Sequence, residues 1–275
     1  AFIIGKVCLG LRSDYLAIAT LLISGIVVSA VKHEEWLTRG VKNVTGLKRP
    51  APYEVDLQNS DWFINFIEFL FQGRLSKIYN LDEKIIALNE LVITSSGIFV
   101  KLCFSFIFSI VLITILVFSE RALRSPWGRM MRAIRDNEDA AKAMGKNVVK
   151  RHLHIFIIGS AIIGFSGAML VTYDGLFTPA SYQPLRYTFI IWVMVLLGGT
   201  GNNYGAILGA FVVWFIWIES APFALFLIEI LMSQTDDTNQ LKIHLIDSIP
   251  YFRYLVMGLG LLLVMRYRPK GLLPE

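Results

Sequence analysis

The chain has 275 residues, of which 55% are hydrophobic and 17% are charged, and its mean hydropathy is +0.58. Soluble globular domains carry about 25% charged residues, so this composition excludes an ordinary water-soluble fold. The net charge of +5 is the usual result of Lys and Arg on the cytoplasmic loops of a membrane protein, and it does not indicate nucleic-acid binding. We therefore expect an integral, multi-pass protein whose surroundings include the lipid bilayer.

Six apolar segments are predicted to cross the membrane as helices, because the hydrocarbon core requires about 20 consecutive apolar residues and several of them approach that length. They are residues 13–31, 98–119, 153–173, 187–197, 204–219 and 251–265. Pro222 is expected to interrupt the fifth segment, so that residues 223–232 form either an interfacial helix or a continuation. The predicted fold is an all-α polytopic membrane protein, a bundle of about six transmembrane helices in a single membrane-spanning domain over residues 1–275.

Positive charge on the short loops predicts which side of the membrane each loop faces. Residues 120–154 carry nine Lys or Arg and the tail after Met265 carries three more, so both are predicted to be cytoplasmic, with the C-terminus inside. Counting spans from there places residues 32–97 outside, as a long extracytoplasmic loop. Its aromatic-rich run, residues 62–71, is too short to span and is predicted to form a helix at the membrane surface.

The cytoplasmic segment, residues 120–152, contains signals for two short helices. Ser125 is followed by a proline, which is typical of an N-cap and a first helical residue. Asn137 predicts a second N-cap, with two acidic residues after it at the positive end of the helix dipole. Gly145 lies where a left-handed residue would end that helix. The simplest alternative is an ordinary connecting loop whose charges only set the topology.

The residues after this second cap resemble a known motif. The run Asp139-Ala140-Ala141, followed by Gly145 and then Ile155, is similar to the E-A-A-x-x-x-G loop of ABC importer permeases and its downstream isoleucine. The sequence departs from that pattern in having Asp139 for Glu, and Ile158 where the fuller motif has proline. The resemblance implies that this helix inserts into a groove of an ATPase subunit and transmits its movement. The coupling residues that it implies are Arg132, Arg135, Asn137, Glu138, Asp139, Ala140, Ala141 and Gly145.

Five motifs in order resemble the LivM-type permease of branched-chain amino acid importers. They are Leu11-Arg12-Ser13-Asp14-Tyr15-Leu16-Ala17-Ile18, Leu37-Thr38-Arg39-Gly40 with Val44-Thr45-Gly46, Ser125-Pro126-Trp127-Gly128-Arg129, Leu196-Leu197-Gly198-Gly199-Thr200-Gly201 and Arg268-Pro269-Lys270-Gly271-Leu272. The resemblance covers nearly the whole chain. Because the chain opens inside an apolar stretch with no charged leader before it, we expect the N-terminal spans of that family to be missing.

The resemblance implies a permease subunit of an ATP-binding-cassette importer that moves branched-chain amino acids across a bacterial inner membrane into the cytoplasm. The implied partners are a homologous second permease, two ATPase subunits and an extracytoplasmic substrate-binding protein. The sequence has no G-x-x-x-x-G-K-[ST] phosphate loop, so ATP and magnesium are expected on the separate ATPase subunits. We expect no enzymatic activity, cofactor or metal site in this chain, since His152 and His154 are two residues apart and would point to different sides of a helix.

Small residues recur at four-residue intervals in two of the predicted spans. This spacing lets two membrane helices approach closely, so helix packing is the default explanation and a lining of the substrate pathway is the alternative. A glycine-rich segment between the fourth and fifth spans is expected to form a tight cytoplasmic turn. The residues assigned to packing or to the pathway are Ser160, Gly164, Ala168, Gly198, Gly199, Gly201, Gly205 and Gly209.

Three other functions remain open at this point. An ion-coupled secondary transporter would need carboxylates in the middle of the membrane, whereas Glu219 and Glu229 are expected near the outer boundary and Asp174 in a loop. A membrane-embedded enzyme would need a nucleophile, base or metal-ligand set at one depth, which the four histidines do not supply. The same type of importer could carry urea or short amides, because no polar cluster in the sequence identifies a clamp for an amino acid.

Overall fold

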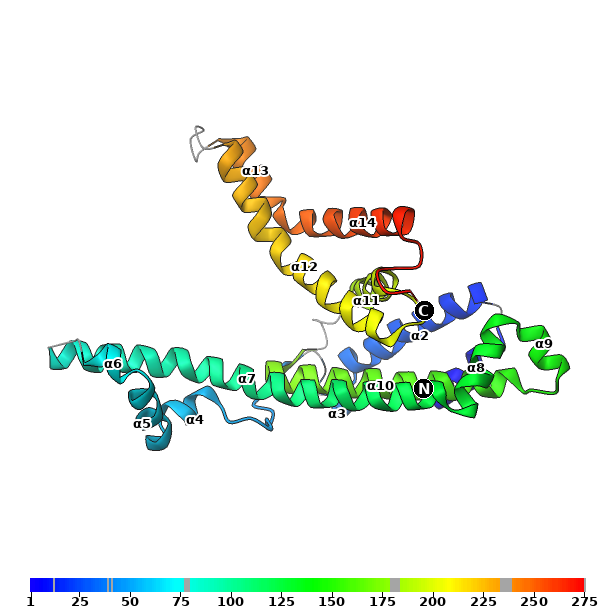
Figure 1. The fold of residues 1–275 in the computed structure, drawn as a ribbon, viewed down its shortest axis with the longest axis horizontal. Coiled ribbons are helices and arrows are strands. Elements are labelled where there is room, and N and C mark those ends of the chain that lie inside the picture. The colour runs from blue at the N-terminus through cyan, green and yellow to red at the C-terminus, as the bar shows by residue number, and fades with distance from the viewer. Residues whose placement is uncertain are drawn as a thin grey trace. The chain divides into compact units, whose positions relative to one another are not determined.

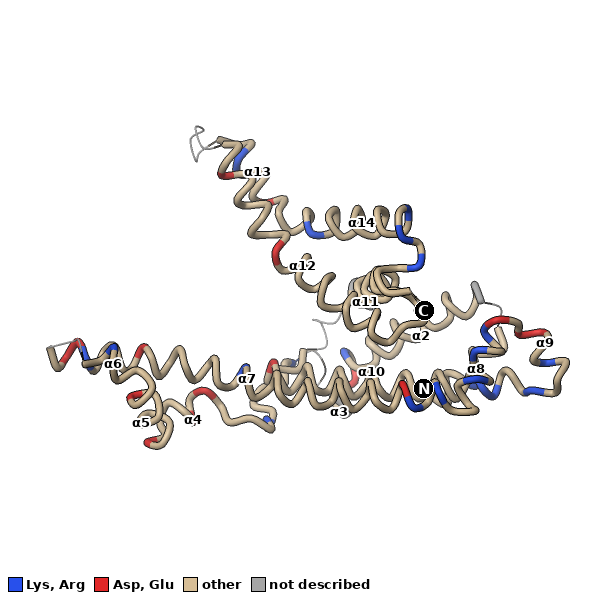
Figure 2. Tube along the Cα trace, viewed as in Figure 1, with Lys and Arg blue, Asp and Glu red and all other residues tan. Residues whose placement is uncertain are grey.

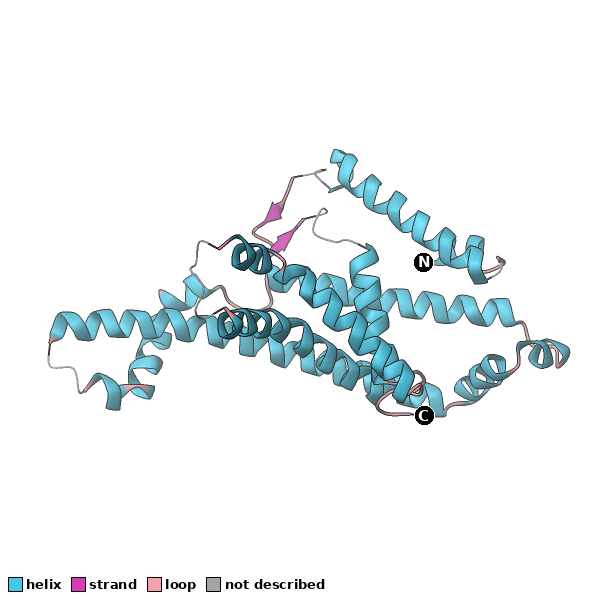
Figure 3. Cartoon of the chain, turned by 90° about the horizontal axis from the view of Figure 1, so that it is seen from above, coloured by secondary structure: helices cyan, strands magenta, loops and turns pink. Residues whose placement is uncertain are grey.

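The computed structural model describes residues 1–11, 13–38, 40, 42–76, 80–178, 184–232 and 239–274 (Figure 1). It divides into two compact units, Ala1–Ser181 and Tyr182–Glu275. The described residues are mainly helical, as the sequence predicts, with one small pair of strands (Figure 3). Two residues of the sequence motifs, Arg12 and Arg39, lie outside the described residues.

Among the residues that the structure describes, five helices are long and apolar enough to cross a membrane, in agreement with the predicted all-α fold. They are α2 (Ser13–His33), α7 (Leu81–Arg124), α10 (Val148–Asp174), α12 (Asn203–Leu231) and α14 (Ile249–Tyr267). The predicted fourth span corresponds to α11 (Pro184–Gly198), an apolar helix that is shorter than the other five. Few side chains of the five long helices are buried within the chain, so their apolar surfaces remain available to lipid and to neighbouring subunits.

Two predicted helix ends are wrong. The second span was expected to begin at residue 98, but α7 begins at Leu81, after Asn80, whose side chain accepts a hydrogen bond from the Asp82 N–H at 3.3 Å. The fifth span was expected to be interrupted at Pro222, but α12 continues through this proline to Leu231. Of the two alternatives for residues 223–232, the structure therefore has the continuation.

The first unit has short helices around α2, α7 and α10. In chain order these are α1 (Phe2–Cys8), α3 (Glu35–Thr38), α4 (Glu54–Gln58), α5 (Asp61–Leu70), α6 (Gln72–Leu75), α8 (Pro126–Asp136) and α9 (Glu138–Ala143). Helix α1 packs closely on α10 at Gly5, where a Cβ would lie 2.7 Å from Cδ1 of Leu153. Glycine at this position therefore allows the two helices to approach.

The 44 residues of α7 make it about 66 Å long, roughly twice the thickness of the hydrocarbon core. Helices α4, α5 and α6 pack against its N-terminal half (Figure 1). Leu57, Phe63, Ile67 and Val92 are buried in the core that they share. Residues 32–97 thus contain a small helical assembly, and the extracytoplasmic location of this assembly stays a prediction.

Helix α5 is the aromatic run that was expected to lie at the membrane surface. It buries Phe63 and Ile67 against α7, and its other face exposes Trp62 and Phe69. The helix that was expected from this run is present, but one of its faces is covered by α7. The placement of the exposed aromatic face in the membrane interface stays a prediction.

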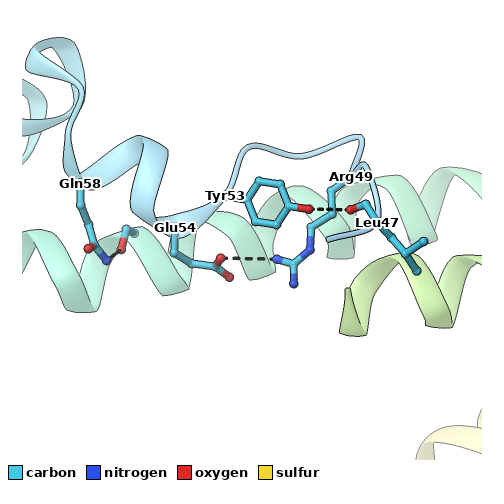
Figure 4. A network of polar contacts seen from close by, with 6 residues as sticks. Leu47, Arg49, Tyr53, Glu54 and Gln58 are labelled. Atoms are coloured by element: carbon cyan, nitrogen blue, oxygen red, sulfur yellow. Dashed lines mark hydrogen bonds and ion pairs between the residues drawn. The ribbon is translucent and has the colours of Figure 1, made fainter. Parts of the chain in front are cut away.

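Arg49 is at the centre of a polar network in the segment before α4 (Figure 4). Its guanidinium lies 3.4 Å from the Glu54 carboxylate and stacks over the Tyr53 ring, with 4.8 Å to the ring centroid. The Tyr53 hydroxyl donates a hydrogen bond to the Leu47 carbonyl. The same guanidinium packs against Gly175, the left-handed residue that ends α10, where a Cβ would lie 2.5 Å from Nη2. This network fixes the segment to the end of α10.

Two further contacts connect the same segment to the long helices. The strands β1 (Val44–Thr45) and β2 (Leu176–Phe177) form an antiparallel pair, which was not predicted from the sequence. The Gln58 amide donates a hydrogen bond to the Ser96 hydroxyl at 3.0 Å, joining α4 to α7 (Figure 4). Residues 44–58 are therefore attached to both α7 and α10.

The second unit contains α11, α12 and α14 together with the short helix α13 (Gln240–Asp247). Helix α12 packs against both α11 and α14. The core between them consists of Ile190, Val193, Leu197, Val213, Trp217 and Met257, all of which are buried.

Candidate functional site

The chain turns sharply from α7 into α8 at Ser125. The Ser125 hydroxyl accepts a hydrogen bond from the Gly128 N–H at 3.3 Å and donates one to the Ala122 carbonyl at 2.6 Å. A Cβ on Gly128 would overlap the carbonyl oxygens of Ala122 and Leu123, so a glycine is needed where α8 passes the end of α7. The predicted N-cap at Ser125 is confirmed.

Both predicted ends of α9 are also confirmed. Oδ1 of Asn137 accepts a hydrogen bond from the Ala140 N–H at 2.9 Å, which makes Asn137 the N-cap. Gly145 has a φ of 76°, and its N–H donates to the Lys142 carbonyl at 2.9 Å. The Lys146 N–H donates to the Ala141 carbonyl at 3.1 Å, which completes a Schellman motif. A helix of six residues is thereby held at both ends.

Helices α8, α9 and α10 share one small core. Ile134 of α8, Ala141 of α9 and Val148 of α10 are buried together, and Met130 and Met131 pack against them. The turn from α9 to α10 is short, because Asn147 already caps α10 by accepting a hydrogen bond from the Lys150 N–H at 3.0 Å. These buried side chains therefore join α9 to both α8 and α10.

The remaining surface of α9 is exposed and charged. Lys142 forms ion pairs with Glu138 at 2.8 Å and Asp139 at 3.8 Å. The hydrogen bond from Lys142 and its positive charge lower the pKa of Glu138, and the same hydrogen bond raises the pKa of Lys142. Because the pKa of Glu138 is depressed and that of Lys142 is raised, the stabilisation from this pair is present at neutral pH. It is lost as the pH falls through the pKa of Glu138 or rises through the pKa of Lys142. At the end of the helix, the side chain of Met144 is 80% exposed.

The structure distributes the predicted coupling residues over two helices. Six of them form α9 and its caps, with only Ala141 buried: Asn137, Glu138, Asp139, Ala140, Ala141 and Gly145. Arg132 and Arg135 lie on α8, where Arg135 pairs with the neighbouring Asp136 at 3.2 Å. Two features of this site were not predicted from the sequence: the exposed side chain of Met144 and the ion pairs of Lys142. An apolar residue just before the terminal glycine, and a Lys four residues after Glu138, are the signals that indicate them.

Asn137→Ala is expected to increase trypsin cleavage after Lys142 and Lys146 in the detergent-purified protein by about fivefold, because loss of an N-cap costs about 1 kcal/mol. A six-residue helix has little stability of its own, so its caps decide whether it forms. Asn137→Asp keeps an acceptor for the Ala140 N–H and is expected to be cleaved at the wild-type rate. Equal cleavage rates for Asn137→Ala and the wild type would contradict the assigned cap.

The glycines of the second unit lie where α11 and α12 are in closest contact. A Cβ on Gly198 would overlap the carbonyl oxygen of Gly205, and one on Gly205 would lie 2.7 Å from the carbonyl oxygen of Gly198. A Cβ on Gly209 would overlap the carbonyl oxygen of Met194 and lie 2.8 Å from Cα of Gly198. These three glycines allow the two backbones to touch, which is the kind of packing that the spacing of Gly205 and Gly209 suggests.

The turn after α11 binds the C-terminal tail of the chain. The N–H groups of Leu272 and Leu273 donate hydrogen bonds to the carbonyls of Leu197 and Gly198, each at 2.9 Å. Gly199 and Gly271 both have positive φ, and a Cβ on Gly271 would overlap the backbone of Gly199. Two sequence motifs that lie about seventy residues apart in the chain therefore meet at this turn. Gly201 also has a positive φ, of 99°.

The other set of small residues lies on α10 and has a different environment. Gly164 and Ala168 are exposed and Ser160 is half-buried. A Cβ on Gly164 would have no neighbour within 4 Å among the described residues. Both roles that were predicted for this face of α10, helix packing and lining of the substrate pathway, therefore stay predictions.

Comparison with known proteins identifies the family. A sequence model described as "Branched-chain amino acid transport system / permease component" matches residues 1–265. The probable branched-chain amino acid transport permease protein LivM of Methanocaldococcus jannaschii is 31% identical over 176 residues, or 62% of this chain and 46% of that protein. The high-affinity branched-chain amino acid transport system permease proteins LivM of Escherichia coli and Salmonella typhimurium are each 25% identical over 280 residues, or 99% of this chain and 54% of theirs.

The chain spans about half the length of these curated relatives. No solved structure matches it. The resemblance deduced from the sequence motifs is confirmed by the family match, which extends over nearly all of the chain. The chain belongs to the family of permease components of branched-chain amino acid transport systems.

Proposed function

We propose that this chain is the membrane-spanning permease subunit of an ATP-driven importer that moves branched-chain amino acids into the cytoplasm. The observation that carries this proposal is the construction of α9. It is a short helix capped at both ends, exposed on one side and joined through a buried core to α8 and α10. A rigid, exposed helix attached to a membrane span is suited to receive a movement from another subunit and to pass it on.

In the proposed mechanism, two separate ATPase subunits bind ATP and magnesium and close around them. Their movement displaces α9, and the core around Ile134, Ala141 and Val148 transmits the displacement to α10. Together with a homologous second permease, the spans then open a pathway alternately to either side. An extracytoplasmic binding protein delivers the amino acid, and this chain itself catalyses no covalent reaction.

The proposed orientation follows from the charges along the chain. Lys and Arg concentrate around α8, α9 and the start of α10, and again at the end of α14 and in the tail (Figure 2). The positive-inside rule assigns both groups to the cytoplasm. This orientation puts α9 on the side where ATP is available, in a bacterial inner membrane, with the α4–α6 assembly on the other side.

Purification of the tagged, full-length protein from its native membrane in mild detergent tests this proposal. We expect two kinds of partner to co-purify, a second permease and ATPase subunits. The Asp139 side chain is 96% exposed, so Asp139→Arg leaves the packing of α9 unchanged. This variant is expected to lose the ATPase subunits and to keep the second permease.

Asp82→Arg is the matched control, because Asp82 and Asp139 each occupy the second position of a helix that has an Asn N-cap. Any effect of the new charge on the helix dipole is therefore similar at the two sites. The control is expected to retain both partners. Recovery of the wild-type chain alone, with no ATPase activity stimulated by a binding protein, would contradict the proposed function.

A further inference from the structure

A cluster of three basic residues, here called the tail cluster, lies where α14 ends. Arg266 belongs to the last turn of α14, and Arg268 and Lys270 follow it in the tail (Figure 2). All three residues are exposed. None of them forms an ion pair with a residue that the structure describes. Three positive charges within five residues are therefore available to a negatively charged partner.

The backbone that carries these charges is held in place by hydrogen bonds. The Arg268 N–H donates to the Val264 carbonyl at 2.7 Å, and the Arg268 carbonyl accepts from the Gly271 N–H at 2.8 Å. The tail that follows is bonded to the end of α11, and the Asn202 side-chain amide donates to the Pro274 carbonyl at 3.3 Å. A flexible tail would lose conformational entropy when it bound a partner, whereas this tail is already ordered.

The position of the tail cluster is that of a membrane–water interface. Helix α14 is long and apolar enough to cross a membrane, and the cluster begins in its last turn. Tyr267 lies between the first two basic residues and is 71% exposed, and tyrosine is enriched at the level of the lipid headgroups. The Arg266 guanidinium lies 5.9 Å from the centroid of the Tyr267 ring. We therefore expect the three charges at the depth of the headgroups.

An exposed apolar surface leads along α14 to these charges. Leu259 and Leu262 are 57% and 69% exposed, and they precede Arg266 by seven and four residues. Residues at these intervals lie on the same face of a helix, so the two leucines and the arginine form one stripe. A partner that matches this stripe has a long apolar part and a negatively charged end.

We propose that the tail cluster binds the headgroup of an anionic phospholipid, whose acyl chain lies along Leu259 and Leu262. The phosphate accepts hydrogen bonds from the basic side chains, which are the usual donors to phosphate in proteins. A free phosphate has no part that would contact the leucines, and a zwitterionic headgroup adds a cation that the cluster repels. The inference requires α14 to cross the membrane and does not depend on the cargo of the permease.

Photolabelling of the tagged, full-length protein, purified in mild detergent with its partners, tests this inference. The probe is phosphatidylglycerol with a diazirine in the acyl chain near the glycerol, and labelled residues are identified by mass spectrometry. We expect labels on the last turns of α14 and on the tail. Unlabelled phosphatidylglycerol is expected to compete, phosphatidylcholine to compete at least about tenfold more weakly, and inorganic phosphate not to compete.

The double variant Arg268→Gln, Lys270→Gln is expected to reduce this labelling by about twentyfold, because each basic residue near an anionic lipid strengthens binding by about fivefold. The matched control is Lys42→Gln, Lys48→Gln. These two lysines are also exposed, lie outside the helices and strands, and form no ion pair with a described residue. The control lowers the net charge by the same amount, and it is expected to be labelled at α14 like the wild type.

Undiminished labelling of the double variant, labels confined to other helices, or equal competition by phosphatidylcholine or inorganic phosphate would overturn the inference. Co-purification of the ATPase subunits provides a further test. We expect the double variant to retain them, whereas their loss with unchanged labelling would show that the tail cluster binds a protein instead. Because leucine is not part of these measurements, failure of the proposed function would leave their outcome unaffected.

Discussion

Gly145→Val is expected to reduce ATP-dependent leucine uptake by about tenfold while leaving membrane insertion and ATP hydrolysis in place. Gly145 has a φ of 76°, a conformation that costs a side chain with a Cβ about 1–2 kcal/mol and a β-branched one more. The substitution would unwind the Schellman motif between α9 and α10, so that a movement of α9 no longer reaches α10. The measurement is uptake and ATP hydrolysis by the same proteoliposomes.

Gly46→Val is the matched control for this prediction. Gly46 has a φ of 74° and, like Gly145, has no atom of a described residue within 4 Å of an added Cβ, so the backbone strain is similar. It lies in the segment before α4, far along the chain from α9, and its substitution is expected to leave coupling intact. Gly145→Asn is expected to recover most of the uptake, because Asn tolerates the left-handed conformation. Normal uptake by Gly145→Val would count against α9 as the coupling helix.

Gly209→Ala is expected to destabilise the protein by about 1–3 kcal/mol or more, because an added methyl group has no room between α11 and α12. The new Cβ would overlap the Met194 carbonyl and lie 2.8 Å from Cα of Gly198. Both neighbours are backbone atoms, so α11 and α12 must move apart to accommodate it. The measurement is thermal unfolding of the purified protein in detergent, with recovery from the membrane as a second indicator.

Gly260→Ala on α14 is the control, since an added Cβ there has no neighbour within 4 Å among the described residues. The substitution is expected to stabilise the protein slightly, because alanine is up to about 1 kcal/mol more favourable than glycine within a helix. The two variants, which carry the same chemical change, should therefore shift the unfolding temperature in opposite directions. A decrease of equal size in both would contradict close packing at Gly209.

The features that the sequence predicted correctly depend on local interactions. Ser125, Asn137 and Gly145 form their capping hydrogen bonds within five residues along the chain, and such bonds can be recognised from residue type and spacing. Apolar runs likewise indicate membrane spans without knowledge of their neighbours. The spacing of Gly205 and Gly209 indicated close packing, but it could not identify Gly198 as the partner.

The features that it missed depend on distant residues or on context. Residues 81–97 are too polar for a membrane span and become helical as an extension of α7, on which α4 and α5 pack. Pro222 ends helices in water but is tolerated within a membrane helix, so α12 continues through it. The hydrogen bonds between the C-terminal tail and the end of α11 join residues that are far apart in the chain, and no local pattern encodes them.

Leucine uptake by proteoliposomes that contain the full-length protein, its co-purified partners and the binding protein is the most direct test of the central claim. We expect labelled leucine to accumulate only when ATP is present on the side of α9 and the binding protein is on the other side. Isoleucine and valine should compete, whereas urea and acetamide should not. Uptake driven by an ion gradient without ATP, or equal uptake of labelled urea, would contradict it.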